Sequence, residues 1–212
     1  MKKPSLHQLS NGLKVLLYNS FNLTTNSILV LVKTGTDYED KKNNGISHFL
    51  EHIFFKGTKN FPSPQALGFE LDKIGAEYNA FTSYEYTGYY IKTLPEYFER
   101  GIYLMSDLLI NPLFNEEEIE KEKNVILEEI NFHKDNPIAL IFDETLKTCY
   151  GDQPAGWSIL GREEVIKKIN SEKIKNYFKK HYSSKNSLIV IAGNFDKNKI
   201  LKTLEKYFKN YN

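Results

Sequence analysis

A chain of 212 residues can bury about 70% of the surface that its unfolded form exposes, so we expect residues 1–212 to form one domain with a substantial core. The 28 Lys and Arg residues nearly balance the 27 Asp and Glu residues, giving a net charge of +1. This balance excludes the strongly basic surface that non-specific nucleic-acid binding requires, and no nucleic-acid partner is expected.

The sequence shows no export or membrane signal. Cys149 is the only cysteine, which rules out an internal disulfide and suits a reducing compartment. The lysines near the start are not followed by the apolar stretch of about 7–15 residues that a secretory signal needs. The longest apolar runs, 28–32 and 188–192, are far shorter than the ~20 residues that cross a bilayer and predict buried strands. We therefore expect a cytoplasmic protein without a membrane partner.

The first elements in the chain are predicted to be strands. Segments 6–9 and 13–18 flank an Asn-Gly dipeptide, which accepts the positive φ angles of a tight hairpin turn. A third strand is expected at 27–34. The polar stretch 37–44 then predicts a solvated loop before the next helix.

Segment 45–56 predicts an amphipathic helix that Gly57 ends. Its apolar residues recur at i, i+3, i+4, i+7 and i+8, the spacing of a helix with one buried face. These residues are Ile46, Phe49, Leu50, Ile53 and Phe54.

Capping residues and strand propensities predict the elements of the remaining chain. In chain order they are helix 64–74, strands 76–83 and 86–93, helix 95–110, helix 116–134, a helix opened by Pro137, loop 151–161, helices near 162–169 and 172–181, strand 187–193, and a last helix introduced by Asp196. This order predicts an α+β fold, in which an antiparallel sheet packs against helices.

The string HFLEH at 48–52 carries the clearest chemical signal. On a helix, Glu51 and His52 lie about 60° and 40° from His48, on opposite sides of it, so all three point the same way, opposite the apolar stripe. Two imidazoles at this spacing can bind zinc, and a glutamate between them can accept the proton of a zinc-bound water. The plain alternative is an ordinary polar helix face.

A catalytic zinc site needs a third protein ligand, which the acidic helix 116–134 can supply. Helical phase places Glu129 within the apolar face and Glu122 about 20° away on the same line, whereas Glu128 falls on the solvent side. We expect Glu129 to be the ligand, because a metal ion would offset the cost of a carboxylate facing the core. Glu122 is expected to orient a ligand or the water, the alternative being a solvated helix charge. The apolar face is formed by Ile119, Val125, Ile126 and Ile130.

The other histidines, His7, His133 and His181, stand alone in the sequence. Isolated histidines are more often surface or packing residues than ligands. We expect no metal role for them, with His133 held as a weak reserve ligand.

HFLEH, followed after 76 residues by Glu129 within VILEEI, resembles the inverted zinc-binding motif of the pitrilysin or insulinase family. The opening hairpin, the segment GAEYNAFTSYEYTGYY and the WSILG loop are also similar to that family's catalytic amino-terminal domain. Within the family, the motifs are similar to those of the mitochondrial processing peptidase β-subunit and of bacterial relatives.

The resemblance implies a role for each site residue. His48, His52 and Glu129 correspond to the ligands of one Zn²⁺ per chain, Glu51 to the catalytic base and Glu122 to the supporting acid. It also implies that an extended peptide pairs with an exposed strand edge at Asn79, Ala80, Phe81, Thr82 and Ser83. For this segment an interior strand remains the alternative.

The resemblance further implies that activity needs a homologous second half, as a separate subunit or as the remainder of a longer protein. In relatives that half supplies an Arg-Tyr pair that binds substrate, and no such pair can be assigned in these 212 residues. The expected function is a zinc endopeptidase acting on extended peptides or unfolded segments. The alternatives are a catalytically silent peptide-binding or scaffold subunit, a structural zinc site, and, in place of the second half, a homodimer.

Overall fold

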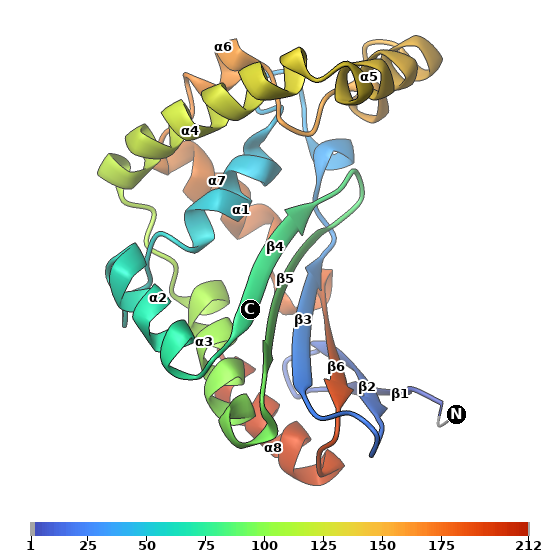
Figure 1. The fold of residues 1–212 in the computed structure, drawn as a ribbon, viewed down its shortest axis with the longest axis vertical. Helices are drawn as coiled ribbons and strands as arrows, with labels where there is room; N and C mark the ends of the chain where they lie inside the picture. The colour runs from blue at the N-terminus through green and yellow to red at the C-terminus, as the bar shows by residue number, and fades with distance from the viewer. Residues whose placement is uncertain (1–2, 212) are drawn as a thin grey trace.

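The structure is a computed structural model that describes residues 3–211, and it contains one six-stranded sheet with order β1-β2-β6-β3-β5-β4 (Figure 1). Four of the five strand pairings are antiparallel, and the pairing of β2 with β6 is parallel. The expected α+β class is confirmed, with a mixed sheet. The strands are β1 Ser5–Gln8, β2 Lys14–Asn19, β3 Asn26–Val32, β4 Glu77–Thr82, β5 Thr87–Thr93 and β6 Ser187–Gly193.

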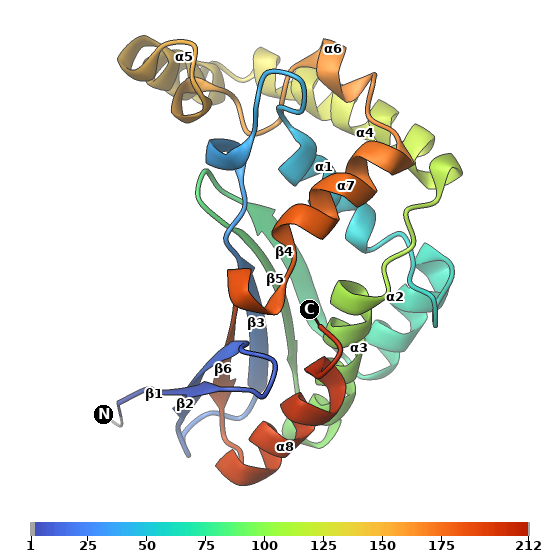
Figure 2. The ribbon, with the colours of Figure 1, turned by 180° about the vertical axis from the view of Figure 1, so that it is seen from behind.

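Helices connect and cover the strands, with α3 and α8 packed together near the lower part of the sheet and α4 lying across its upper end (Figure 2). In the central strands β3 and β6 every second residue is buried, so one face of the sheet forms the core. The helices are α1 Ile46–Phe54, α2 Pro64–Lys73, α3 Phe98–Ile110, α4 Glu116–Asp135, α5 Pro137–Tyr150, α6 Glu163–Ile166, α7 Ser171–His181 and α8 Lys197–Phe208, with short 3-10 turns at Thr36–Tyr38, Pro95–Tyr97, Pro154–Gly156 and Ser184–Asn186.

Most predicted elements are found within a few residues of their expected bounds. The hairpin turn differs in detail: of its Asn-Gly pair only Gly12 has a positive φ (88°), and no residue other than glycine has one among residues 3–211. Segment 162–169 also forms a shorter helix than expected, since α6 ends at Ile166. None of the helices in the described residues 3–211 is both long and apolar enough to cross a membrane.

Helix α1 is held between α4, α7 and strand β4, which surround it on several sides. All five apolar residues of its predicted stripe are buried, with Phe49, Leu50 and Phe54 fully excluded from solvent. This burial fixes the rotation of the helix and leaves its polar side facing α4. The predicted amphipathic pattern is therefore confirmed.

The expectation of a solvated loop at 37–44 is wrong for two of its residues, Glu39 and Asn44, which are buried. The Glu39 carboxylate accepts hydrogen bonds from the backbone N–H of Gly45 (2.7 Å) and of Ser47 (2.9 Å) and from the Asn44 amide (3.1 Å). The first N–H groups of a helix have no partner within the helix, and a carboxylate there satisfies them. Glu39 of this loop thus caps α1. The polar composition of segment 37–44 alone does not predict that role.

Candidate metal centre

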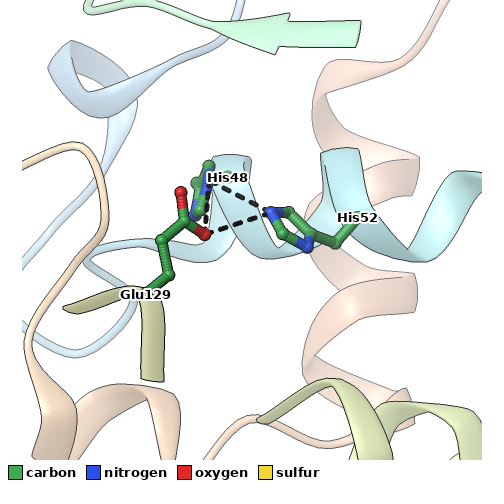
Figure 3. A group of neighbouring side chains, drawn as sticks. All are labelled: His48, His52 and Glu129. Carbon is green, nitrogen blue, oxygen red and sulfur yellow. Dashed lines mark hydrogen bonds and ion pairs between the residues drawn. The ribbon is translucent and has the colours of Figure 1, made fainter. Parts of the chain in front are cut away.

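Helix α1 brings His48 and His52 together on the side that faces α4 (Figure 3). Their Nε2 atoms lie 3.2 Å apart, and their rings meet edge to face with centroids 4.6 Å apart. His48 is 7% exposed and His52 is half-buried. The spacing of four residues on a helix thus produces the shared face that the sequence predicted.

Glu129 reaches this pair from α4 (Figure 3). Its Oε2 atom lies 3.7 Å from Nε2 of His48 and 3.5 Å from Nε2 of His52. Within residues 3–211, these three form the one group of His, Cys, Asp or Glu whose ligand atoms come close enough to hold a metal ion, all within 4.8 Å of one another. The structure brings together the three residues that the sequence proposed as ligands.

The three side chains fit a zinc ion in both spacing and chemistry. In a tetrahedral site with bonds of about 2.0–2.1 Å, neighbouring donor atoms lie about 3.3–3.4 Å apart. The observed separations of 3.2, 3.5 and 3.7 Å bracket that value. Two imidazoles and one carboxylate also leave a fourth position for water, which is the composition of a catalytic site and not of a closed structural one.

The environment of His48 keeps its imidazole neutral. Burial, followed by the neighbouring His52, lowers the pKa of His48 to about 3. A neutral ring has the free lone pair that a metal ion requires.

Glu122 orients the second histidine. Its Oε1 atom lies 2.8 Å from Nδ1 of His52, so that nitrogen donates its proton and Nε2 is left free to face the site. Burial lowers the pKa of His52, but the hydrogen bond and the charge of Glu122 outweigh burial and raise it. Glu122 is only 4% exposed, which excludes the alternative of a solvated helix charge.

Lys56 completes this arrangement and was missed by the sequence reasoning. Its ammonium group lies 2.6 Å from Oε2 of Glu122, on the side opposite His52. Burial alone would raise the pKa of Glu122, but the hydrogen bonds from His52 and Lys56 hold it below its ordinary value. The available signal was its position four residues after His52, one helical turn along the same face.

The predicted phase of helix α4 was partly wrong. Val125, expected in the apolar face, is 51% exposed, and the Glu129 side chain is 41% exposed. Glu122 and Ile126 are buried, and Glu128 is exposed as expected. The buried face of α4 is therefore formed by Ile119, Glu122, Ile126 and Ile130, and Glu129 lies at its edge.

Glu51 lies between the two histidines on α1 and is half-buried. Burial raises its pKa, and a hydrogen bond from the Thr82 hydroxyl to its Oε2 atom (2.5 Å) opposes that effect. His52 and Glu129 are close enough for their charges to influence the same pKa. A carboxylate of raised pKa beside the ligands has the properties of a general base.

Residues 79–82 of the segment 79–83 lie in β4, which is an edge strand of the sheet within the described residues and not an interior strand. Asn79 and Phe81 are exposed, whereas Ala80 and Thr82 are half-buried on the face toward α1. Ser83 follows the last residue of the strand. The backbone of β4 pairs with β5 on one side and has no strand on the other within the described residues.

The other histidines do not join the three-ligand group. His7 pairs with the Ser5 hydroxyl, and His133 lies 3.0 Å from Asp143. His181 is buried against Tyr177. His133 thus contacts a carboxylate of α5 and does not act as the reserve ligand.

Comparisons with known proteins show the family of the chain. The profile of the insulinase family, peptidase family M16, matches residues 14–163, and that of the peptidase M16 inactive domain matches residues 168–212. The chain is 39% identical to an uncharacterized zinc protease of Rickettsia felis over 96% of this chain and 49% of that protein. It is 37% identical to mitochondrial-processing peptidase subunit beta of Mus musculus over 94% of this chain and 40% of that one.

A solved structure shows the same fold. The crystal structure of a protease from Helicobacter pylori superposes with a TM-score of 0.93 at 27% identity, over 99% of this chain and 50% of that chain. The chain spans about half the length of the curated relatives it matches. The insulinase profile covers 150 of the 212 residues, including all the residues assembled at the metal centre. The chain therefore belongs to the insulinase family of peptidases, family M16.

Proposed function

We propose that this chain is the catalytic domain of a zinc-dependent endopeptidase that hydrolyses extended peptides or unfolded protein segments. The observation that carries the proposal is the group formed by His48, His52 and Glu129, with a fourth position left for water. Relatives named as zinc proteases support it.

Each residue of the site has a distinct part in the proposed reaction. His48, His52 and Glu129 would hold one Zn²⁺, which when bound polarises the scissile carbonyl and lowers the pKa of a bound water towards about 7. Glu51 accepts a proton from the attacking water and delivers it to the leaving amine. Glu122 keeps His52 in the tautomer that presents Nε2.

The substrate is proposed to pair with the open edge of β4. Main-chain hydrogen bonds along residues 79–83 would hold an extended peptide with little regard to its sequence. The strand lies against α1, so a peptide bound there runs beside Glu51. An extended backbone is required for this pairing, which favours unfolded segments over folded proteins.

A homologous second half is the proposed partner, either as a separate subunit or within one longer chain. The relatives are about twice as long as the matched region, and one of them is named as a subunit. A second half would close the site against bulk water and add substrate-binding groups.

A silent peptide-binding or scaffold subunit is the second candidate, because the profile of an inactive domain matches residues 168–212. That match begins after every residue of the candidate metal centre. The intact set of ligands and base therefore favours a catalytic role for this half.

The proposal is tested by incubating the zinc-loaded protein, together with its second half, with a reduced and unfolded substrate protein. Mass spectrometry should detect new peptides whose formation stops when a chelator removes the metal. Tight peptide binding without cleavage would instead establish the silent subunit.

A further inference from the structure

We propose that Thr82 is a positioning residue that holds the Glu51 carboxylate in place for proton transfer, and so links the substrate-binding strand to the catalytic base. The inference rests on the proposed peptidase function. It assigns to the Thr82 side chain a role separate from the main-chain pairing proposed for its strand.

The contact depends on the register of β4. Side chains on a strand alternate between its two faces, so Tyr78, Ala80 and Thr82 share the half-buried face. That face lies against α1, and the Tyr78 ring packs beside Phe55, the residue that follows this helix, with centroids 5.5 Å apart. Thr82 is the last strand residue on this face, and its Oγ1 donates to Oε2 of Glu51 at 2.5 Å.

The strand itself is well anchored at this point. Thr82 pairs across the sheet with Thr87 of β5, which is fully buried and donates its hydroxyl to the backbone carbonyl of Thr34. The branched Thr side chain has few rotamers, so an anchored backbone also fixes the hydroxyl.

A glutamate needs such a partner to act as a precise base. Its side chain has three rotatable bonds, and Glu51 has one side-chain hydrogen bond in the described residues, the one from Thr82. A hydroxyl offers one proton, so it engages one carboxylate oxygen and leaves the other for the water. It also adds no charge that would compete with a metal ion.

The strand proposed to bind the peptide at its free edge is thus also the strand that holds the base, through the Thr82 hydroxyl. Loss of the hydroxyl should therefore reduce kcat with little change in KM, because the main-chain pairing that binds the peptide remains.

The test compares Thr82→Val, which keeps the shape and strand propensity but lacks the hydroxyl, with Thr82→Ser, which keeps the hydroxyl. Thr93→Val is the matched control, because it removes a hydroxyl from the last residue of β5, far from Thr82, where the hydroxyl donates to the Leu94 carbonyl. Crystal structures of the metal-free variants report the Glu51 side chain, and peptide turnover by the zinc-loaded assembly with the second half reports kcat and KM.

The expected result for Thr82→Val is a Glu51 carboxylate that leaves its wild-type position and a kcat lowered on the order of 10- to 100-fold, the usual effect of a hydrogen bond to a charged group. Thr82→Ser should restore both, while KM and zinc content stay near wild type throughout.

An unmoved Glu51 or an unchanged kcat in Thr82→Val would overturn the inference. Failure of the proposed function is a separate outcome, because the wild-type assembly would then cleave no peptide. The crystal structures would still show whether the Glu51 carboxylate depends on the Thr82 hydroxyl for its position.

Discussion

At the scale of single residues, the two carboxylates beside the histidines have opposite environments. Glu122 is paired with His52 and Lys56, which keep its pKa below the ordinary value. Burial raises the pKa of Glu51, and the hydrogen bond from the neutral Thr82 hydroxyl and the charge of His52 oppose this effect. Glu122 is thus a fixed, charged support for His52, whereas Glu51 is a group that can exchange protons.

Replacing Glu129 by Gln should weaken zinc binding more than about 100-fold, because loss of a ligand costs more than loss of a supporting contact, which costs 10- to 100-fold. Glu128→Gln is the matched control, since its side chain is exposed on the same helix. Competition with a fluorescent chelator measures both affinities. Equal affinities in the two variants would contradict the assignment of Glu129.

The cap of α1 gives a prediction for the pH dependence of stability. Burial raises the pKa of Glu39 above 4.5, although the N–H groups of Gly45 and Ser47 oppose it. An acid with a raised pKa in the folded state contributes stability that is complete below its unfolded pKa and is lost as pH rises through the folded value. Glu39→Gln lacks this titration.

The unfolding free energy of the wild type minus that of Glu39→Gln should therefore fall as pH rises from about 4 through the raised pKa. Urea titrations of the metal-free proteins at a series of pH values measure this difference. A difference in unfolding free energy that stays constant, or that grows with pH, would show that folding does not raise the pKa of Glu39.

At the scale of elements, the sequence predicted those whose signal is local and missed contacts made between distant segments. The stripe of α1 and the caps of α2 and α8 are read from neighbouring residues, and Ser63 and Asp196 do cap these helices. The parallel β2–β6 pair joins residues more than 170 positions apart, and no periodicity encodes which strands become neighbours.

The candidate site divides in the same way. The histidines and Glu51 could be predicted because a helix of known spacing carries all three. Glu129 was placed by helical phase and by family resemblance, and the exposed Val125 shows that phase alone was inaccurate. The contact of Thr82 with Glu51 requires the packing of β4 on α1, which the sequence does not display.

The junction between α1 and the loop that follows α5 is expected to tolerate no side chain. Gly45 is the N-cap residue of α1 with φ 92°, and a Cβ there would lie 2.7 Å from Cα of Gly161 and 2.8 Å from the Leu160 carbonyl oxygen. Gly45→Ala should therefore destabilise the fold by about 2 kcal/mol or more, through strain and steric overlap.

Gly68→Ala is the matched control for this junction. Gly68 lies within α2, where a Cβ would meet nothing within 4 Å, so alanine should stabilise by about 0.5–1 kcal/mol. Thermal unfolding of the two variants should shift in opposite directions. A stable Gly45→Ala protein would show that the loop can move away from α1.

At the scale of the whole molecule, helix α5 differs from the others because none of its residues is buried (Figure 1). Ile138, Ile141 and Phe142 are 81%, 68% and 61% exposed, and Phe132 at the end of α4 is 75% exposed. Large apolar side chains exposed on the surface often mark an interaction site. This exposure supports the proposal of a second half as partner.

Residues 1–212 as a zinc-loaded monomer are expected to hydrolyse an unstructured peptide weakly or not at all. The metal centre would be open to bulk water, and the groups of a second half that position substrate would be missing. Adding the second half should raise kcat/KM, whereas self-association into a homodimer should not. Full activity of the monomer, verified by light scattering, would contradict the need for a partner.

The most direct test of the central claim is a titration of zinc into the metal-free protein, assembled with its second half, while peptide cleavage is recorded. For the wild type, cleavage should rise in proportion to zinc bound at His48, His52 and Glu129 and reach its maximum at one ion per chain. Glu51→Gln should bind the same zinc but lose cleavage by about 10²- to 10⁴-fold, since the base is removed and the ligands remain. Cleavage without zinc, or undiminished cleavage by Glu51→Gln, would contradict the account.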